Sequence, residues 1–387
     1  MSTVNVDVAV VGAGPAGLAA AHACAEAGCT TLVIDRNLHS GGQLIKQIHK
    51  FFGTRDHGAG TRGVDMAGHL TQRAADAGAV LWSDSTCHTI TPACRLEVLT
   101  GGLQYGASPD RMRNRTVLAR RVIIAAGAEE NAVAFPGWTL PGVMGAGAAQ
   151  TMINVHRVLP GRRALMVGSG NVGLIVAHQL LQAGAEVAAV VEAAGRIGGY
   201  GVHSAKIRRS DIPILTSHTI SAAHGDHGVE GVTVVRLDEN WNALAGTEQE
   251  LTVDTVCVAA GLRPGTRLAQ LAGCGLVFSG DLGGWTPIHD ADLRTTNTRV
   301  YVAGDAGGVE EASTAVEEGH LAGIAAAEDL GFLEGITARK EKEQVRSRLN
   351  DLRGGPFGRH RMRAKAEVHA RARRQKRTVK GGPDHAG

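Results

Sequence analysis

Two stretches of this chain carry the glycine spacing that holds a dinucleotide pyrophosphate against the start of a helix. In such a turn the first glycine permits a tight bend, the second lets the backbone approach the pyrophosphate, and the third lets the helix pack closely on the strand. The sequence therefore predicts two nucleotide sites in series. The binding residues expected are Gly12, Gly14, Pro15, Ala16 and Gly17 at the first site, and Gly168, Gly170, Asn171 and Gly173 at the second.

An acidic residue ends the strand that follows each glycine turn, where it would accept a hydrogen bond from an adenosine ribose. At the first site this is Asp35, followed by Arg36, and at the second it is Glu192. Glu192 would repel a 2′-phosphate, which favours NAD over NADP, although Arg196 nearby weakens that preference. A regulatory site for ADP or ATP is the alternative.

The elements that must position these residues follow the same order twice, as a short apolar strand, the glycine turn, an Ala-rich or Leu-rich helix and a second strand. We therefore expect an α/β fold with two Rossmann-like dinucleotide-binding domains of the three-layer ββα type, the second inserted in the first. The expected strands are 6–11, 31–34, 164–167, 186–191, 252–259 and 299–303, and the expected helices are 17–27, 174–183 and 312–327.

The expected domain boundaries follow from this order. Residues 1–143 and 262–330 would form the first dinucleotide-binding domain, which the resemblance described below assigns to FAD. Residues 144–261 would form the second, of NAD(P)-binding type by the same resemblance, and residues 331–387 a basic C-terminal extension. The segment 135–142 has two prolines and two glycines, which neither a helix nor a central strand tolerates, so it is expected to be the crossover between domains.

The two glycine turns and Tyr-Val-Ala-Gly-Asp at 301–305, in this order, resemble the two-dinucleotide-binding-domain flavoproteins, the superfamily of thioredoxin and glutathione reductases, over roughly residues 5–330. The resemblance implies FAD in an extended conformation, with its ribitol and central phosphate region near Gly304 and Asp305. It also implies close backbone approach at Ala126 and Gly127, where the family usually has Ala-Thr-Gly. The helix that begins near Ala312 would be aimed at the flavin pyrimidine.

Within that superfamily, the run 40–44 (Ser-Gly-Gly-Gln-Leu), the cysteine pattern and the segment 145–154 are similar to the α-type subunits of amine and imino-acid dehydrogenases. Relatives of that kind include the proline, hydroxyproline, opine and sarcosine oxidising systems and hydrogen cyanide synthase. Many of these subunits carry a C-terminal cysteine-rich iron–sulfur segment. Here the corresponding region is rich in arginine and has no cysteine, so the resemblance does not extend to a cluster on this chain.

The six cysteines lack the close spacing of a redox disulfide beside a flavin and the clustered spacing of zinc or iron–sulfur ligands. We expect reduced cytosolic thiols and no bound metal. The flavin itself must then accept and deliver hydride, so the task of the protein is to position and tune it.

The expected wall of the flavin site is the segment 41–53, in which Gly42 permits close backbone approach and Gln43 supplies a polar group. Lys46 would tune the flavin and His49 would act as acid or base toward a substrate amine, unless both lie on the surface of a short helix. Arg62 is a candidate clamp for a substrate carboxylate, with a surface or helix-capping role as the alternative. His203 and Lys206 are weaker candidates for contact with a nucleotide phosphate or the flavin.

Charge is unevenly distributed, because residues 353–387 carry eleven Lys and Arg against two Asp and Glu, and the remainder is net acidic. This basic segment would be either a solvated or disordered tail or a docking element for RNA, an acidic partner or an anionic membrane. The start of the chain lacks the basic leader of a signal peptide, and no apolar run is long enough to span a membrane, so a cytoplasmic location is expected.

These observations predict an FAD-dependent oxidoreductase that moves hydride between a small amine or imino-acid substrate, or NAD(H), and a second acceptor. Its expected cofactors are FAD and NAD(H), with NADP or ADP/ATP as alternatives at the second site. The alternative function is that of a nucleotide-binding, electron-transfer or scaffold subunit of a larger dehydrogenase. A second dehydrogenase subunit or another copy of the chain is a possible partner, and nucleic acid is not expected.

Overall fold

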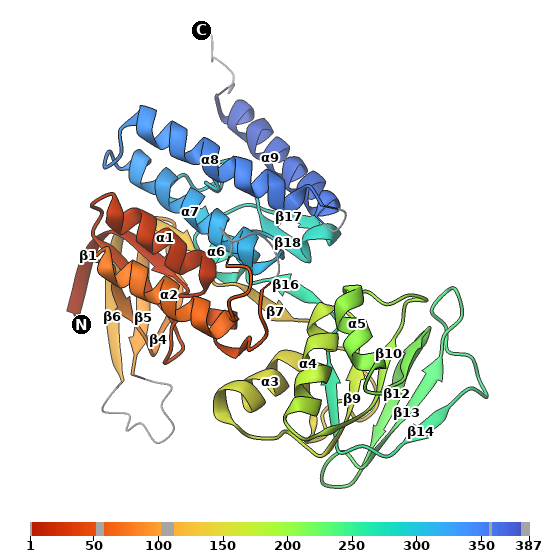
Figure 1. The fold of residues 1–387 in the computed structure, drawn as a ribbon. Coiled ribbons are helices and arrows are strands. Elements are labelled where there is room, and N and C mark those ends of the chain that lie inside the picture. Colours follow the sequence, from red (N-terminus) through yellow and green to blue (C-terminus); the bar gives the residue numbers. More distant parts are fainter. Residues whose placement is uncertain (1, 52–57, 102–111, 356–357, 381–387) are drawn as a thin grey trace. The chain divides into compact units, whose positions relative to one another are not determined.

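The computed structural model describes residues 2–51, 58–101, 112–355 and 358–380, and the chain divides into two units (Figure 1). Unit 1 comprises Met1–Glu129 and Arg263–Gly387, and unit 2 comprises Glu130–Leu262. The junction therefore differs from the expected one at residue 143. The segment 135–142 lies inside unit 2, where Phe135 is part of the core, because its prolines and glycines make turns rather than a crossover.

A seven-stranded sheet forms the centre of unit 1, in the order β3-β2-β1-β6-β5-β4, with β19 paired to β6. Strands β1, β2, β3, β6 and β19 are parallel, whereas β4 and β5 form an antiparallel hairpin beside β6. The strands are β1 Ser2–Val11, β2 Thr31–Ile34, β3 Val80–Trp82, β4 Ser85–Ile90, β5 Arg95–Thr100, β6 Arg113–Ile124 and β19 Val300–Val302.

Both faces of this sheet are buried, which explains the continuous apolar runs of its parallel strands. Helices α1, α2, α7 and α8 contribute to the core on one face, and α6 and side chains of the β4–β5 hairpin to the core on the other (Figure 1). The helices of unit 1 are α1 Pro15–Glu26, η1 Gly42–Lys46, α2 Gly63–Asp76, α6 Arg267–Leu271, η5 Gly280–Leu282, η6 Gly304–Gly307, α7 Ala312–Asp329, α8 Gly335–Arg353 and α9 Arg359–Lys380. Its remaining strands are β17 Leu276–Ser279 and β18 Gly284–Pro287.

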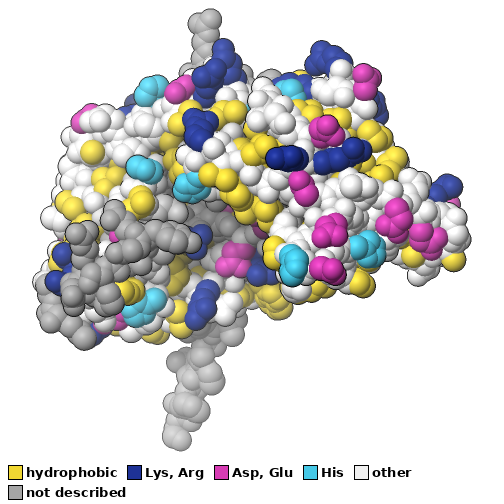
Figure 2. Space-filling model, turned by 90° about the horizontal axis from the view of Figure 1, so that it is seen from below, with side chains coloured by type: hydrophobic (Ala, Val, Ile, Leu, Met, Phe, Trp, Pro, Cys, Tyr) yellow, Lys and Arg dark blue, Asp and Glu magenta, His cyan; other side chains and the backbone are white. Residues whose placement is uncertain are grey.

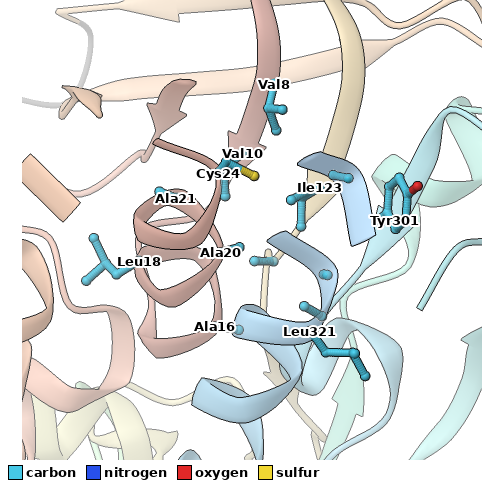
Figure 3. Close-up of a cluster of buried hydrophobic side chains, with 14 of the residues drawn as sticks. Val8, Val10, Ala16, Leu18, Ala20, Ala21, Cys24, Ile123, Tyr301 and Leu321 are labelled. Carbon is cyan, nitrogen blue, oxygen red and sulfur yellow. The ribbon is translucent and has the colours of Figure 1, made fainter. Parts of the chain in front are cut away.

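Small residues let α7 cross α1 at close range. A Cβ atom added at Gly319 would lie 2.1 Å from the carbonyl oxygen of Ala16, and one added at Gly323 would lie 2.6 Å from that of Ala20. Figure 3 shows Ala16 and Ala20 on the side of α1 that faces α7. This contact fixes the start of α1 beside the segment that precedes α7.

Unit 2 has a parallel sheet in the order β11-β10-β9-β15-β8. Its helices cover one face, and the antiparallel strands β12, β13 and β14 pack on the other (Figure 1). The elements are β8 Val143–Gly145, α3 Ala146–Thr151, the π-helical turn η4 Met152–His156, β9 Arg163–Val167, α4 Asn171–Gln182, β10 Glu186–Glu192, α5 Gly201–Arg208, β11 Ile214–Thr216, β12 His218–His224, β13 Gly231–Arg236, β14 Gln249–Leu251 and β15 Thr255–Val258. Paired strands β7 Ala128–Glu130 and β16 Leu262–Pro264 carry the chain between the units.

The basic C-terminal segment is an integral part of unit 1, so the expectation of a solvated tail is wrong for its described residues. Helix α8 packs on α7 and contributes Ala338, Val345 and Leu349 to the core. Helix α9 buries Ala364, Val368 and Ala372 against Val277, Leu282 and Ile288. Periodic small apolar residues among the arginines make this packing possible. In the described part of the chain, no helix has both the length and the hydropathy needed to cross a bilayer.

Candidate functional site

The first glycine turn has the geometry needed for a pyrophosphate. Gly12 has φ +106°, and a Cβ there would lie 2.3 Å from the carbonyl oxygen of Ala125, while a Cβ at Gly17 would lie 1.8 Å from that of Gly12. Gly14 is different, because the nearest atom to a Cβ added there would be the Cα of Gly42, at 3.9 Å. Gly14 caps α1 without a side-chain hydrogen bond, so the backbone N–H groups of the first turn are available to an anion. The turn therefore fits the FAD pyrophosphate.

Asp35 holds this turn from the end of β2. Its carboxylate accepts hydrogen bonds from the backbone N–H of Ala13, at 2.5 Å, and of Asn37, at 2.7 Å. Arg36 is exposed. The acid that the sequence assigned to the ribose thus also fixes the turn and the chain that leaves β2.

A Gly-Gly pair closes over the same turn. The N–H of Gly41 donates to the carbonyl oxygen of Ala13 at 2.7 Å, and a Cβ at Gly42, which has φ +54°, would lie 2.8 Å from the Cα of Gly14. Gln43 follows, exposed, in η1. Gly42 is thus brought directly to the expected pyrophosphate site.

The segment that follows β19 reaches the start of α1. Gly304 has φ +65°, and a Cβ there would lie 2.8 Å from the Cβ of Ala16. The next residue, Asp305, accepts a hydrogen bond from the N–H of Glu310 at 3.1 Å, and Ala312 then begins α7. Burial raises the pKa of Asp305 to about 6, helped by the nearby charges of Glu318, Glu310 and Glu311.

This raised pKa has a testable consequence for the stability of the FAD-free protein. The pKa of Asp305 is higher in the folded protein than in the unfolded chain, so ionisation of Asp305 lowers the free energy of unfolding. This loss of stability grows as pH rises from about 4 to about 6. The variant Asp305→Asn can still accept from Glu310, so we expect it to be more stable than the wild type by about 2 kcal/mol at pH 7. Urea unfolding from pH 4 to pH 7 measures the difference, which should vanish at the acidic end. A constant difference across this range would contradict the assignment.

Ala126 and Gly127 follow the end of β6. Ala126 is exposed, and Gly127 has φ +75°. The carbonyl oxygen of Gly127 accepts from the N–H of Gly265 at 2.9 Å, so the backbone here is fixed by the returning chain.

The second glycine turn repeats the first in unit 2. Gly168 has φ +105°, and a Cβ there would lie 2.3 Å from the carbonyl oxygen of Ala259, while a Cβ at Gly173 would lie 2.1 Å from that of Gly168. A Cβ at Gly170, which caps α4, would meet no atom within 4 Å. Asn171 accepts from the N–H of Tyr200 at 2.8 Å. The turn is therefore shaped for a second nucleotide.

Glu192 binds this turn as Asp35 binds the first. Its carboxylate accepts from the N–H and Oγ of Ser169, at 2.9 and 2.7 Å, and from the N–H of Ala194, at 3.0 Å. The N–H of Gly199 donates to the carbonyl oxygen of Ser169 at 2.8 Å, as Gly41 does to Ala13. The sequence carries the signal for this second closure, because Gly-Gly follows Glu192 at the same spacing as it follows Asp35. That signal was missed.

The candidate catalytic residues lie on the segment that follows Gly42. Lys46 ends η1, and the His49 ring stacks on Phe51 with centroids 5.8 Å apart. A backbone bridge joins Lys50 to Arg62, which is the N-cap residue of α2 and has an exposed side chain that makes no capping hydrogen bond. Residues 52–57, which include the end of the expected wall 41–53, lie outside the described residues.

The weaker candidates lie in unit 2. His203 is buried in α5, with its ring stacked on Tyr200 at 6.3 Å, and Lys206 is half-buried on the same helix. Arg196 is exposed. The burial of His203 gives it a packing role, and contact of either residue with a nucleotide stays a prediction.

Sequence reasoning missed a buried charge cluster beneath Asp305. Glu318 on α7 accepts from the N–H of Gly304 at 3.0 Å, from Lys365 at 2.7 Å and from Arg353 at 2.5 Å. Burial alone would raise the pKa of Glu318, but Lys365 and Arg353 lower it below its usual range, so Glu318 is ionised. Nothing local in the sequence distinguishes Lys365 from the exposed cations around it.

Comparison with known proteins agrees with this geometry. The family model described as pyridine nucleotide-disulphide oxidoreductase matches residues 6–319. An opine oxidase subunit from Agrobacterium tumefaciens (strain Ach5) is 29% identical over 360 residues, which cover 88% of this chain and 69% of that protein.

Two solved structures share the fold. The thioredoxin reductase of T. acidophilum superposes with a TM-score of 0.67 at 21% identity, and the match covers 84% of this chain and 99% of that one. The L-proline dehydrogenase of P. horikoshii superposes with a TM-score of 0.66 at 22% identity, and the match covers 89% of this chain but only 59% of that one.

Proposed function

Because the chain belongs to the pyridine nucleotide-disulphide oxidoreductase family, we propose that this FAD-dependent oxidoreductase transfers hydride without a redox disulfide. The donor would be a small amine or imino acid, or NADH, and the electrons would pass to a second acceptor. The relatives that support this substrate class are the opine oxidase and, by fold, an L-proline dehydrogenase.

The proposal depends on the burial and the raised pKa values of the cysteines. A redox disulfide needs two sulfurs side by side and a thiolate that can attack. Unit 2 has a single cysteine, Cys257, fully buried in β15, and burial raises its pKa to about 12. The other five thiols also have raised pKa values, with burial as the largest cause. None of the six is set up as a nucleophile.

Bound FAD supplies the hydride-accepting and hydride-donating centre of this reaction. The N–H groups of the first turn, near Gly14, would hold its pyrophosphate, and Asp305 would hold its ribitol region. His49 would take up the proton that an amine loses on oxidation, at a ring nitrogen, and Arg62 would orient a substrate carboxylate. The second turn would bind NAD(H), with Glu192 excluding a 2′-phosphate.

Anaerobic reduction of the flavin tests this function. The purified protein is mixed with NADH or with a panel of amines and imino acids, and loss of the visible flavin band is followed. We expect bleaching by at least one of these donors, and the same rate in the variant Cys257→Ser, because no sulfur lies on the route. Thiol titration before and after reduction should count the same number of reactive groups.

The outcomes of this experiment separate the alternatives. New thiols on reduction, or loss of bleaching in Cys257→Ser, would contradict a disulfide-free route. A flavin that no donor bleaches, in a protein that forms a stable complex with a second flavoprotein, would instead support a scaffold or electron-transfer role. The opine oxidase relative is by name one component of a larger enzyme, which favours testing for such a partner.

Nucleic acid is a less favoured partner. A surface that binds nucleic acid gathers Lys and Arg into one patch or stripe. On the face drawn in Figure 2, described Lys and Arg side chains are interspersed with Asp, Glu and hydrophobic ones. This face therefore carries no such patch, and small-molecule substrates and protein partners remain the ones that we propose.

A further inference from the structure

The C-terminal helices α8 and α9 send two cations into the interior of unit 1, beneath the segment that carries Asp305. Arg353 at the end of α8 and Lys365 on α9 have side chains that are 10% and 3% exposed. Both reach Glu318 on α7, which is equally buried. Burying two cations is costly unless each is paired, so this arrangement must be held by its partners.

These cations also contact the segment 304–310 directly. Lys365 Nζ donates to the carbonyl oxygen of Gly307 at 3.0 Å, and Arg353 donates to both carboxylate oxygens of Glu310, at 2.8 and 2.6 Å. Glu318 in turn accepts from the N–H of Gly304. The segment is thus tied directly to α9 at its middle and to α8 at its end, and through Glu318 of α7 to both helices at its start.

The cluster also sets the charge around the start of α7. Three glutamates raise the pKa of Asp305, and the C-terminal helices supply a cation for each: Arg353 for Glu310, Lys365 for Glu318 and Arg361 for Glu311, the last at 3.6 Å. The neighbouring His289 does not add a positive charge, because burial and Lys365 hold its pKa well below the usual range. Without Arg353 and Lys365 this region would be strongly negative.

We propose that α8 and α9 form a cofactor-retention element, in which Lys365 and Arg353 act as positioning residues for the FAD-binding segment 304–310. They fix the backbone that presents Asp305 and neutralise the acids at the start of α7, so that negative charge on the flavin is tolerated there. This inference rests on the FAD-dependent function proposed above.

FAD titration of the full-length apoprotein tests the proposal, with Lys365→Met compared against Lys342→Met. Lys342 is a matched control, because it is also buried in ion pairs, with Glu328 at 2.5 Å and Asp292 at 3.2 Å, but does not contact the segment 304–310. We expect Lys365→Met to bind FAD at least about tenfold more weakly than the wild type. Lys342→Met should lose stability but keep its FAD affinity within about twofold.

The reduction potential of the flavin provides a second readout that a purely structural role would not move. Saturated with FAD, Lys365→Met should have a more negative potential than the wild type, because a positive charge is lost. Glu310→Gln should have a less negative potential than the wild type, because a negative charge is lost. Arg353 stays paired in this variant, since Glu318 remains. Lys365→Arg keeps the positive charge, so its FAD affinity and its flavin potential should both lie closer to those of the wild type than those of Lys365→Met do.

The possible failures are distinguishable. Wild-type apoprotein that does not bind FAD would refute the proposed function itself. FAD affinity that falls equally in both lysine variants would assign α8 and α9 a role in stability alone. If Lys365→Met does not fold, the reduction potential of Glu310→Gln decides between the outcomes. A less negative potential in Glu310→Gln supports the proposal, and an unchanged potential overturns it.

Discussion

Replacing Gly14 by alanine is expected to weaken FAD binding about a hundredfold while the apoprotein remains folded. The protein tolerates this methyl group, because φ at Gly14 is −77° and the added Cβ would be 3.9 Å from the nearest atom. A bound pyrophosphate would not tolerate it, because it needs the backbone N–H groups at that point. Quenching of FAD fluorescence gives the affinity, and urea unfolding should differ from the wild type by no more than about 1 kcal/mol.

Gly17→Ala provides the contrast within the same turn. Its Cβ would lie 1.8 Å from the carbonyl oxygen of Gly12, so the turn itself must distort. We expect this variant to lose both FAD and stability. Wild-type FAD affinity in Gly14→Ala would show that the pyrophosphate does not lie on this turn.

The second large effect is expected at Gly170. A Cβ there meets no protein atom within 4 Å, so Gly170→Ala should fold normally and retain FAD, for which we propose the first turn, in unit 1. NAD(H) affinity should fall at least about tenfold, because the methyl group occupies the path of the second pyrophosphate. Stopped-flow reduction by NADH should slow accordingly, whereas reduction by an amine should not change.

Gly173→Ala is the structural counterpart of this variant. Its Cβ would lie 2.1 Å from the carbonyl oxygen of Gly168, so unit 2 should be destabilised. If Gly170→Ala is reduced by NADH as fast as the wild type, the second turn does not deliver electrons. A regulatory nucleotide or a scaffold role would then gain support.

Local sequence was sufficient for the two nucleotide-binding units. The strands β1, β2, β9 and β10 and the helices α1, α4 and α7 lie where the sequence predicts them, within a few residues. These elements are specified by short-range features. An apolar strand leads to a glycine at a position whose positive φ disfavours other residues, and a helix begins directly after it. Gly12 and Gly168 are the clearest cases.

Features set by distant contacts were not predictable in the same way. The prolines and glycines of 135–142 exclude a helix or a central strand, but they do not reveal to which unit the segment belongs. The burial of Lys365 depends on Glu318, far away in the sequence, and the arginines around Lys365 give its segment the pattern of a solvated surface. The candidate roles of Lys46, His49 and Arg62 remain predictions, because their chemistry depends on a substrate.

The interruption of unit 1 by unit 2 has a consequence for how the protein is made. During translation the ribosome releases unit 2 as one continuous stretch, so all its strands are present as soon as residue 262 has emerged. The first 129 residues cannot complete the fold of unit 1 at that stage. They still lack β19, which pairs with the end of β6, and the contact between Glu318 and Lys365. If Lys365 retains FAD as proposed, full retention becomes possible only after residue 365 has emerged, and the sheet of unit 1 stays incomplete until β19 has been made.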